Sequence, residues 1–280
     1  MPSAESCSGV LGLMSAFVWG AGDFFGGYSS RKANVSGVVA FSQSIGLFPL
    51  VLAAVIVGEA FLKPRDLLWS AAAGVMSGLG VITYYAVLSR GSMAYAAPVT
   101  GLVSTSVPAL TGSFIEGLPK ASQAVGFVLA LVSIALVTGA TKTSFKLSPR
   151  FVLAAFAGIC FGSFLVFLGQ VSEGSVLFPL AVSRLVTVAM AAVLVKGLTD
   201  WKRVAKAYPY VTAAGLFDTG GSFLFLLARQ LGRLDVAGVL SSLYPISTII
   251  LAKTILNEPI GKKRATGIIT AAAATITINI

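Results

Sequence analysis

The sequence predicts an all-α integral membrane protein in which ten transmembrane helices form two inverted five-helix repeats. Three observations support this fold class. The composition is strongly apolar, ten apolar segments are long enough to cross a bilayer, and a pattern near the middle of the chain returns near its end. The connections between these segments are too short to contain a separate water-soluble domain.

The composition excludes an ordinary water-soluble domain. The 280 residues are 56% hydrophobic and 11% charged, with a mean hydropathy of +0.91. Soluble domains contain about 25% charged residues, so this chain has too few to cover a surface that faces water. The net charge of +10 could indicate nucleic acid binding. The basic residues, however, lie at the ends of apolar segments, where they anchor helices at the membrane interface. The lipid bilayer, and no nucleic acid, is therefore the expected partner.

Metal and cofactor chemistry is not expected from the sequence. Cys7 and Cys160 are too few and too far apart for a disulfide framework or a metal site. The chain contains no histidine, which removes the commonest metal ligand and the usual acid–base residue near neutral pH. The apolar segments contain no paired carboxylates one helical turn apart. We therefore predict no metal, no cofactor and no enzyme activity.

The first half of the chain contains five apolar segments. The first segment is predicted to be a membrane helix and not a cleaved signal peptide, because no basic residue precedes it and Asp23 interrupts its apolar run. The connections that follow are short and polar, with Arg31 and Lys32 in the first and Lys63 and Arg65 in the second. The predicted spans are 8–28, 36–58, 67–88, 94–115 and 122–140.

The second half contains five further apolar segments. A polar run at 141–150 with three basic residues separates it from the first half, and the longest connection, 196–208, is also basic. The triplet Lys262, Lys263 and Arg264 precedes the last segment. The predicted spans are 151–171, 175–195, 209–229, 236–256 and 265–280.

An internal repeat relates the two halves. A hydroxyl-rich stretch with a proline leads to Glu116 in the first half and again to Glu258 in the second. The two glutamates lie 258 − 116 = 142 positions apart, close to half the chain length. We therefore predict repeats at 1–143 and 149–280. Because each repeat has an odd number of helices, the second must enter the bilayer from the opposite side. Inverted repeats are typical of transporters with a substrate site near the midplane.

Four ionisable residues fall inside the predicted spans, where such side chains are costly and by default indicate function. Lys253 lies about one turn from the interface, so it can extend its amine to water. Arg184 and Asp218 lie at similar depth on consecutive antiparallel helices. They form either a structural ion pair or a site in which Arg184 binds a substrate carboxylate and Asp218 is its counter-charge or a proton carrier. Asp23 has no obvious basic partner, so it binds a cation or a proton or is held by hydroxyl groups.

Polar uncharged residues extend this candidate site. Hydroxyl groups are concentrated in the fourth and ninth spans, beside Pro98, Pro108 and Pro245. Such prolines free backbone carbonyls, and they are tolerated where a helix faces protein or a wet cavity. Any one of these hydroxyls could instead bond its own helix backbone, and core packing is the commoner use of the aromatic residues. The candidate substrate-binding residues are Trp19, Asp23, Gln43, Tyr84, Thr100, Ser104, Arg184, Asp218, Ser241, Ser242 and Tyr244.

The motifs of the chain resemble those of a known family. Two five-helix halves, the pair Trp19-Gly20 in the first span and a Pro–Glu–Gly pattern closing each half are similar to the EamA-type members of the drug/metabolite transporter superfamily. In that family a proline in the fourth and ninth helices precedes a loop glutamate at a fixed distance. Pro245 and Glu258, 258 − 245 = 13 positions apart, match this pattern, whereas Val103 stands at the corresponding position of the first half. The resemblance covers essentially the whole chain.

The resemblance implies a ten-helix bundle with a central cavity lined mainly by helices one to four and six to nine. Helices five and ten would lie at the periphery. It also implies a secondary transporter of the cell membrane that moves a small polar solute, an amino acid or a similar metabolite, by alternating access. Export and proton coupling are the expected direction and energy source. An exporter of drugs or other organic cations is the alternative, and a passive channel is a further one. The oligomeric state stays open.

The orientation in the membrane also stays open. Thirteen basic residues lie in the connections on one side of the predicted bundle and five in those on the other. Because basic residues accumulate on the cytoplasmic side, this distribution predicts that both termini face away from the cytoplasm. The family resemblance implies the opposite, with both termini in the cytoplasm.

Overall fold

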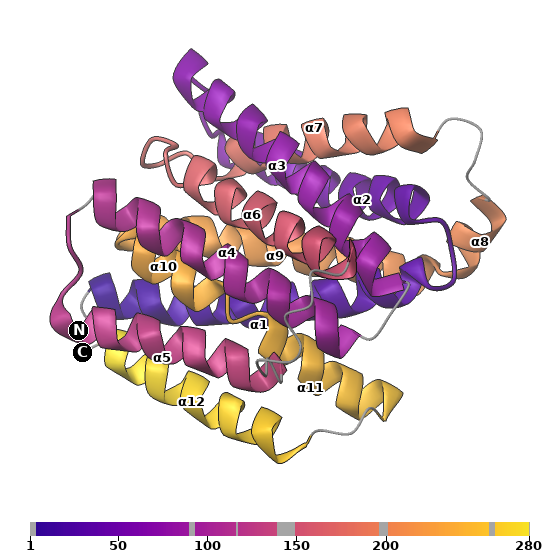
Figure 1. Cartoon of the computed structure of the whole chain (residues 1–280). Coiled ribbons are helices and arrows are strands. Elements are labelled where there is room, and N and C mark those ends of the chain that lie inside the picture. Colours follow the sequence, from indigo (N-terminus) through magenta and orange to yellow (C-terminus); the bar gives the residue numbers. More distant parts are fainter. Residues whose placement is uncertain are drawn as a thin grey trace.

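The computed structural model describes residues 4–89, 93–115, 117–138, 149–195, 201–257 and 261–279, which form a bundle of α-helices (Figure 1). The two glutamates of the repeated pattern, Glu116 and Glu258, lie outside the described residues. The helices are α1 (Ala4–Ser30), α2 (Val35–Val57), α3 (Pro64–Ser89), α4 (Met93–Ile115), α5 (Ala121–Thr138), α6 (Pro149–Leu168), α7 (Leu177–Val195), α8 (Trp201–Lys206), α9 (Tyr208–Leu231), α10 (Leu234–Ser241), α11 (Pro245–Leu256) and α12 (Lys262–Asn279).

The all-α membrane fold is confirmed, whereas the count of ten spans is not. Within the described part of the chain, seven segments are long and apolar enough to cross a bilayer. Shorter apolar stretches occur at Val99–Ile115 in α4 and Ala121–Ser133 in α5. The seven long segments are α1, α2, α3, α6, α7, α9 and the combined stretch Leu234–Leu256.

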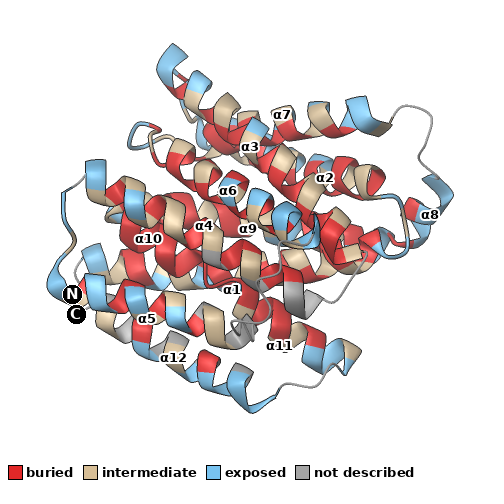
Figure 2. Ribbon diagram, viewed as in Figure 1, coloured by how far each residue is buried: buried red, intermediate tan, exposed pale blue. Residues whose placement is uncertain are grey.

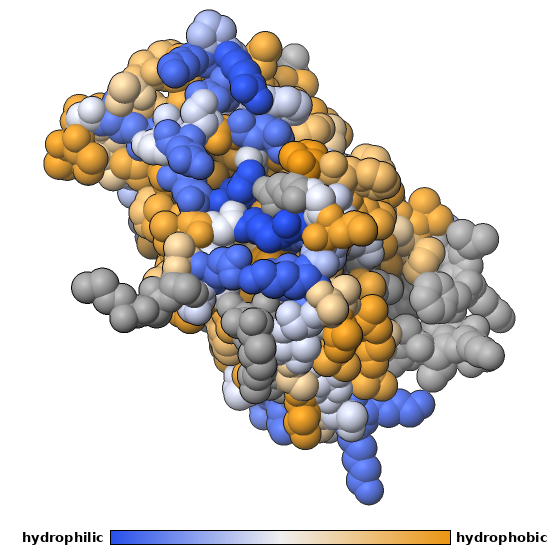
Figure 3. Space-filling model, turned by 90° about the vertical axis from the view of Figure 1, so that its left-hand side faces the viewer, coloured by the Kyte–Doolittle hydropathy of each residue, from blue (hydrophilic) through white to orange (hydrophobic). Residues whose placement is uncertain are grey.

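The outer surface of the bundle is apolar and the end of the bundle is polar. Buried residues concentrate along the helix interfaces, while Phe48, Val55 and Phe114 are 71%, 67% and 88% exposed on outer faces (Figure 2). Such side chains are stable only if lipid covers them. Figure 3 shows the end of the molecule that carries the termini, where a band of hydrophilic side chains lies between apolar flanks. This distribution is the one expected of a bundle that spans a bilayer.

The two predicted repeats interlock and do not form separate bundles. Helix α1 packs mainly on α9, α2 on α7, and both α3 and α4 on α6, so each of these contacts joins the first half to the second. Helices α5 and α12 pack against each other along one edge of the bundle (Figure 1). That edge position agrees with the peripheral place expected for the fifth and tenth helices.

The predicted span 236–256 is wrong as one continuous helix. Helix α10 ends at Ser241, a turn occupies 242–244, and α11 begins at Pro245. Pro245 has no N–H to donate to the preceding turn, so the hydrogen-bond ladder stops there. Such a break is tolerated at membrane depth only where protein or a cavity covers it. A second difference is that the predicted connection 196–208 contains the short helix α8.

Helix α1 covers this break at very close range. The Ser247 hydroxyl donates to Ala16 O at 3.1 Å, and the Thr248 hydroxyl donates to Gly20 O at 3.0 Å. A Cβ atom at Gly20 would lie 1.8 Å from Ser247 Oγ and 2.3 Å from Tyr244 O. Only glycine permits this approach, because any side chain would collide with the backbone of the break. The Gly20 position therefore fixes the break against α1.

Side chains also join the halves at the end that carries the termini. The Glu59 carboxylate, after α2, accepts hydrogen bonds from the backbone N–H groups of Leu177 and Phe178 at 2.9 Å. It therefore satisfies donors that the first turn of α7 leaves free. Nearby, Asp66 Oδ1 accepts hydrogen bonds from the Ser172 N–H and hydroxyl at 3.1 Å. These contacts fix the α2–α3 connection of the first half to the α6–α7 connection of the second.

Candidate substrate cavity

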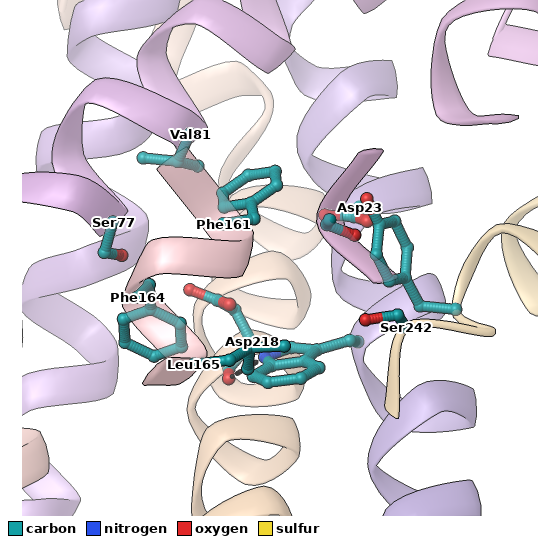
Figure 4. A pocket seen from close by; sticks show the side chains of 11 residues that line it. Asp23, Ser77, Val81, Phe161, Phe164, Leu165, Asp218 and Ser242 are labelled. Carbon is teal, nitrogen blue, oxygen red and sulfur yellow. Dashed lines mark hydrogen bonds between the residues drawn. The ribbon is translucent and has the colours of Figure 1, made fainter. Parts of the chain in front are cut away.

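A cavity lies inside the bundle (Figure 4). Its walls come from α1, α3 and α4 in the first half and from α6, α9 and the α10–α11 break in the second. Four of the lining side chains are aromatic and two are carboxylates, and none is basic. The lining residues are Trp19, Asp23, Ser77, Val81, Ser104, Phe161, Phe164, Leu165, Asp218, Ser242 and Tyr244.

One carboxylate of the cavity, Asp218, belongs to a buried hydrogen-bond network. Gln43 Nε2 donates to Asp218 Oδ2 at 2.7 Å, and Arg184 Nη1 forms an ion pair with the same oxygen. Arg184 Nη2 also donates to Asp218 O at 3.0 Å and to Ser222 Oγ at 2.7 Å. Arg184 is 3% exposed and lies behind the cavity wall. Helices α2, α7 and α9 are therefore joined by one charged cluster.

Trp19 connects this cluster to the aromatic wall. Its indole N–H lies 3.0 Å from Asp218 O and 3.3 Å from Ser222 Oγ, and it donates to both acceptors. The indole ring stacks on Phe225 at 5.9 Å and meets the edge of Phe164 at 6.2 Å, measured between ring centroids. The hydrogen bonds of the N–H group fix the polar edge of the indole, and the neighbouring rings fix its apolar face. The ring forms a rigid part of the cavity wall.

The second carboxylate, Asp23, has a different environment. Among the described residues none donates a hydrogen bond to it, although it interacts electrostatically with Asp218, Tyr84 and Tyr244. Figure 4 shows Asp23 and Asp218 reaching the cavity from separate helices. The Tyr84 hydroxyl is buried without a hydrogen-bond partner among the described residues, and the Tyr244 hydroxyl is buried beside Ser104. Of these groups, the Asp23 carboxylate lines the cavity with its hydrogen-bonding capacity unused.

The eleven predicted site residues divide into three groups. Six of them line the cavity: Trp19, Asp23, Ser104, Asp218, Ser242 and Tyr244. Three others lie directly behind its charged groups: Gln43 and Arg184 beside Asp218, and Tyr84 beside Asp23.

The two remaining predicted residues hold helices together. The Thr100 hydroxyl donates to Ala154 O at 2.9 Å, which links α4 to α6. The Ser241 hydroxyl donates to Gly12 O at 3.3 Å, which links the break to α1. Neither residue lines the cavity. Their placement supports the alternative that hydroxyls in membrane helices bond backbone carbonyls.

Sequence reasoning missed most of the apolar lining. Val81, Phe161, Phe164 and Leu165 contribute to the walls, together with Ser77 of α3. Apolar residues in an apolar helix carry no chemical signal, so only the packing of α3 against α6 reveals that they face the cavity. Among the residues that the structure describes, no three Cys, His, Asp or Glu side chains gather as metal ligands.

The fold and the cavity define a polytopic membrane protein with an internal binding space shared between two halves. The sequence model of the EamA-like transporter family matches this chain twice, at residues 8–139 and at 149–280. The chain therefore belongs to the EamA-like transporter family, and the resemblance found in the sequence is confirmed. Family membership also makes it a transporter and not an enzyme, as predicted.

The comparison with solved structures supports the fold. The crystal structure of another protein aligns with this chain with a TM-score of 0.78 and 18% sequence identity. The alignment covers 96% of this chain and 95% of the other. At this identity the similarity shows a shared fold alone. Among curated proteins, no sequence matches the chain.

Proposed function

We propose that the chain is a secondary transporter of the cell membrane that exports a small solute with an amino group, such as an amino acid or a related metabolite. The observation that carries this proposal is the cavity whose wall is shared by helices of both halves. Ligand sites of transporters built from repeats lie where the repeats meet. A largely apolar, aromatic lining with a few polar groups is typical of a small-molecule site.

Alternating access fits the way in which the halves contact each other. Helices α1 and α2 of the first half pack on α9 and α7 of the second, so a rocking motion at these contacts would reshape both ends of the cavity. The odd number of predicted spans in each half supports an inverted relation between the repeats. A bound solute would shift the balance between the two states by its different affinity for each.

The same proposal includes the direction of transport, its coupling to protons and the orientation of the protein in the membrane. Export follows from the family resemblance. Proton coupling is supported by Asp23, because a carboxylate without a hydrogen-bond donor at membrane depth is suited to exchange a proton. Lys32 follows α1, Lys202 lies in the short helix α8, and Lys262 begins α12, all on the side opposite the termini. The basic excess there supports a cytoplasmic position for that side.

Counterflow in liposomes tests the transport function directly. The purified protein is reconstituted, loaded with an unlabelled amino-acid mixture, and exposed to the labelled mixture with and without a pH gradient. We expect saturable, transient accumulation of label that empty liposomes do not show, together with a response to the gradient. Conductance that never saturates, without counterflow, would identify a passive channel instead.

One observation favours a second candidate, an exporter of organic cations. Both charged residues that line the cavity are carboxylates, Asp23 and Asp218. The cation nearest to them, Arg184, is already bound to Asp218. The electrostatics of the lining therefore favour a positive group on the solute.

A further inference from the structure

We propose that Asp23 is the subsite for the protonated primary amine of the solute, and that the preferred solute is an apolar or aromatic amine without a carboxylate. This inference rests on the proposed transport function and specifies its substrate class. Some polar groups that line the cavity are already paired and others are not, and this difference locates the amine.

The unpaired carboxylate of the cavity matches an ammonium ion. A primary ammonium has three N–H donors and no acceptor. Asp23 lines the cavity and offers acceptor oxygens that no described residue occupies. Buried polar atoms are rarely left unpaired in a folded protein. A bound ammonium would pair with this carboxylate and compensate its charge.

The second carboxylate cannot serve in the same way. Asp218 Oδ2 already accepts hydrogen bonds from Gln43 and Arg184. Its backbone carbonyl accepts from Trp19, Arg184 and Ser222. The charge of Asp218 is therefore already compensated by the Arg184 guanidinium. The amine binds at Asp23, whose charge no described residue compensates.

The same geometry disfavours a carboxylate on the solute. The lining contains no basic side chain. Both terminal nitrogens of Arg184 are engaged, with Gln43 and Asp218 on Nη1 and with Asp218 O and Ser222 on Nη2. The carboxylate of an amino acid would therefore enter an aromatic space near Asp218 without a positive partner. Burying an unpaired charge is strongly unfavourable.

The apolar part of the solute has its own wall. Phe161 and Phe164 line the cavity with Asp23 and Asp218 (Figure 4). Trp19 completes this wall from α1. Aromatic faces bind apolar groups and also attract a nearby ammonium ion through cation–π interaction. An amine joined to a ring by a short chain would occupy both regions together.

Three probes that share a phenyl ring separate these contributions. Phenethylamine carries only the amine, L-phenylalanine carries the amine and a carboxylate, and 3-phenylpropionate carries only the carboxylate. Each is measured for counterflow in liposomes that contain the purified protein. We expect phenethylamine to be carried with the lowest half-saturating concentration, phenylalanine about tenfold or more above it, and phenylpropionate not at all.

Variants then test the subsite itself. Asp23→Asn should raise the half-saturating concentration of phenethylamine about 30-fold or more, because it removes a buried charge partner. Glu173→Gln is the matched charge control, since Glu173 is exposed in the connection between α6 and α7. It should behave as the parent.

The outcomes separate this inference from the transport proposal. Counterflow of phenylalanine or phenylpropionate that exceeds that of phenethylamine overturns the amine subsite and leaves transport intact. Equal phenethylamine transport by the parent and Asp23→Asn, with both proteins folded as judged by size exclusion, also overturns it. If none of the three probes shows counterflow, the amine assignment fails, and the amino-acid mixture alone decides whether the protein is a carrier. Because the probe series uses the unmodified protein, it stays decisive even if a variant fails to fold.

Discussion

Two carboxylates share one cavity but have opposite surroundings. Asp218 receives hydrogen bonds from Gln43 and from Arg184. Asp23 lines the cavity and receives none from the described residues. Both carboxylates lie on helices that are long and apolar enough to cross the bilayer. The comparison shows that a charge in a membrane helix indicates function only after its partners are known.

The hydrogen-bonded network around Asp218 stabilises the fold, whereas the Asp23 carboxylate is available to bind a ligand. Around Asp218 the network connects α2, α7 and α9, so these helices hold one another in place. A buried ion pair is costly to break, because removing one partner leaves the other uncompensated. Around Asp23 no such connection exists. A ligand can therefore bind there without breaking a contact that the fold needs.

The largest expected effect is the loss of stability on breaking the Asp218 network. Arg184→Met keeps much of the side-chain volume but leaves Asp218 and Gln43 without their buried cation. We expect destabilisation by about 3–5 kcal/mol, because the buried carboxylate then lacks compensation. Thermal unfolding of the detergent-solubilised protein measures the change.

A double variant serves as the control for that experiment. Arg184→Met combined with Asp218→Leu removes both charges, so most of the lost stability should return. If Arg184→Met alone unfolds at the parent temperature, the network is not structural. Arg184 would then be free to serve as the anchor for a substrate carboxylate, and the contrast between the two carboxylates would disappear.

Much of this contrast could be predicted from the sequence. Arg184 and Asp218 lie at matching depth on antiparallel spans, so their pairing follows from geometry that the apolar pattern already defines. For Asp23, no basic residue lies at a similar depth in a neighbouring span. The family motif around Pro245 also indicated where the second half departs from a regular helix. Intramembrane charges and prolines are rare, so each one carries a strong signal.

The remainder of the site depends on packing that no sequence pattern specifies. Phe161 and Phe164 are two of many apolar residues in α6, and only the contact of α6 with α3 and α4 turns them toward the cavity. The roles of Thr100 and Ser241 depend on which backbone carbonyl lies opposite. The sequence predicted one continuous span at 236–256 and not a break at 242–244, because a proline alone fixes neither the angle between the two segments nor the helix that covers them.

The next largest effect concerns the contact that holds Tyr244 beside Asp23. Gly20→Ala would place a Cβ atom against Ser247 Oγ and the Tyr244 carbonyl. We expect destabilisation by about 1–3 kcal/mol from this overpacking. Gly220→Ala is the matched control, since a Cβ there would meet only Val18 Cγ1 at 3.3 Å. It should be neutral or slightly stabilising in a helix. Equal melting temperatures for both variants would show that the break does not depend on close contact with α1.

A smaller effect of opposite sign is expected at Asp23. Asp23→Asn replaces a carboxylate that lacks donors with a neutral amide, which removes the cost of a charge at membrane depth. Stability should rise by about 1–2 kcal/mol, even though amine transport falls. Asp66→Asn provides the contrast, because Asp66 accepts two hydrogen bonds from Ser172 and its replacement should lower the melting temperature. A loss of stability in Asp23→Asn would mean that the fold itself requires this carboxylate.

The smallest expected effect comes from one hydroxyl group. Tyr84 Oη is buried and has no hydrogen-bond partner, so Tyr84→Phe should raise stability by about 1 kcal/mol or less. Ser15→Ala is the matched comparison, because Ser15 Oγ is equally buried but donates to Gly221 O at 2.7 Å, and its loss should lower stability by about 1 kcal/mol. Thermal unfolding of both variants in the same detergent shows whether each substitution raises or lowers stability. If both variants lose stability, the Tyr84 hydroxyl has a partner in the free protein.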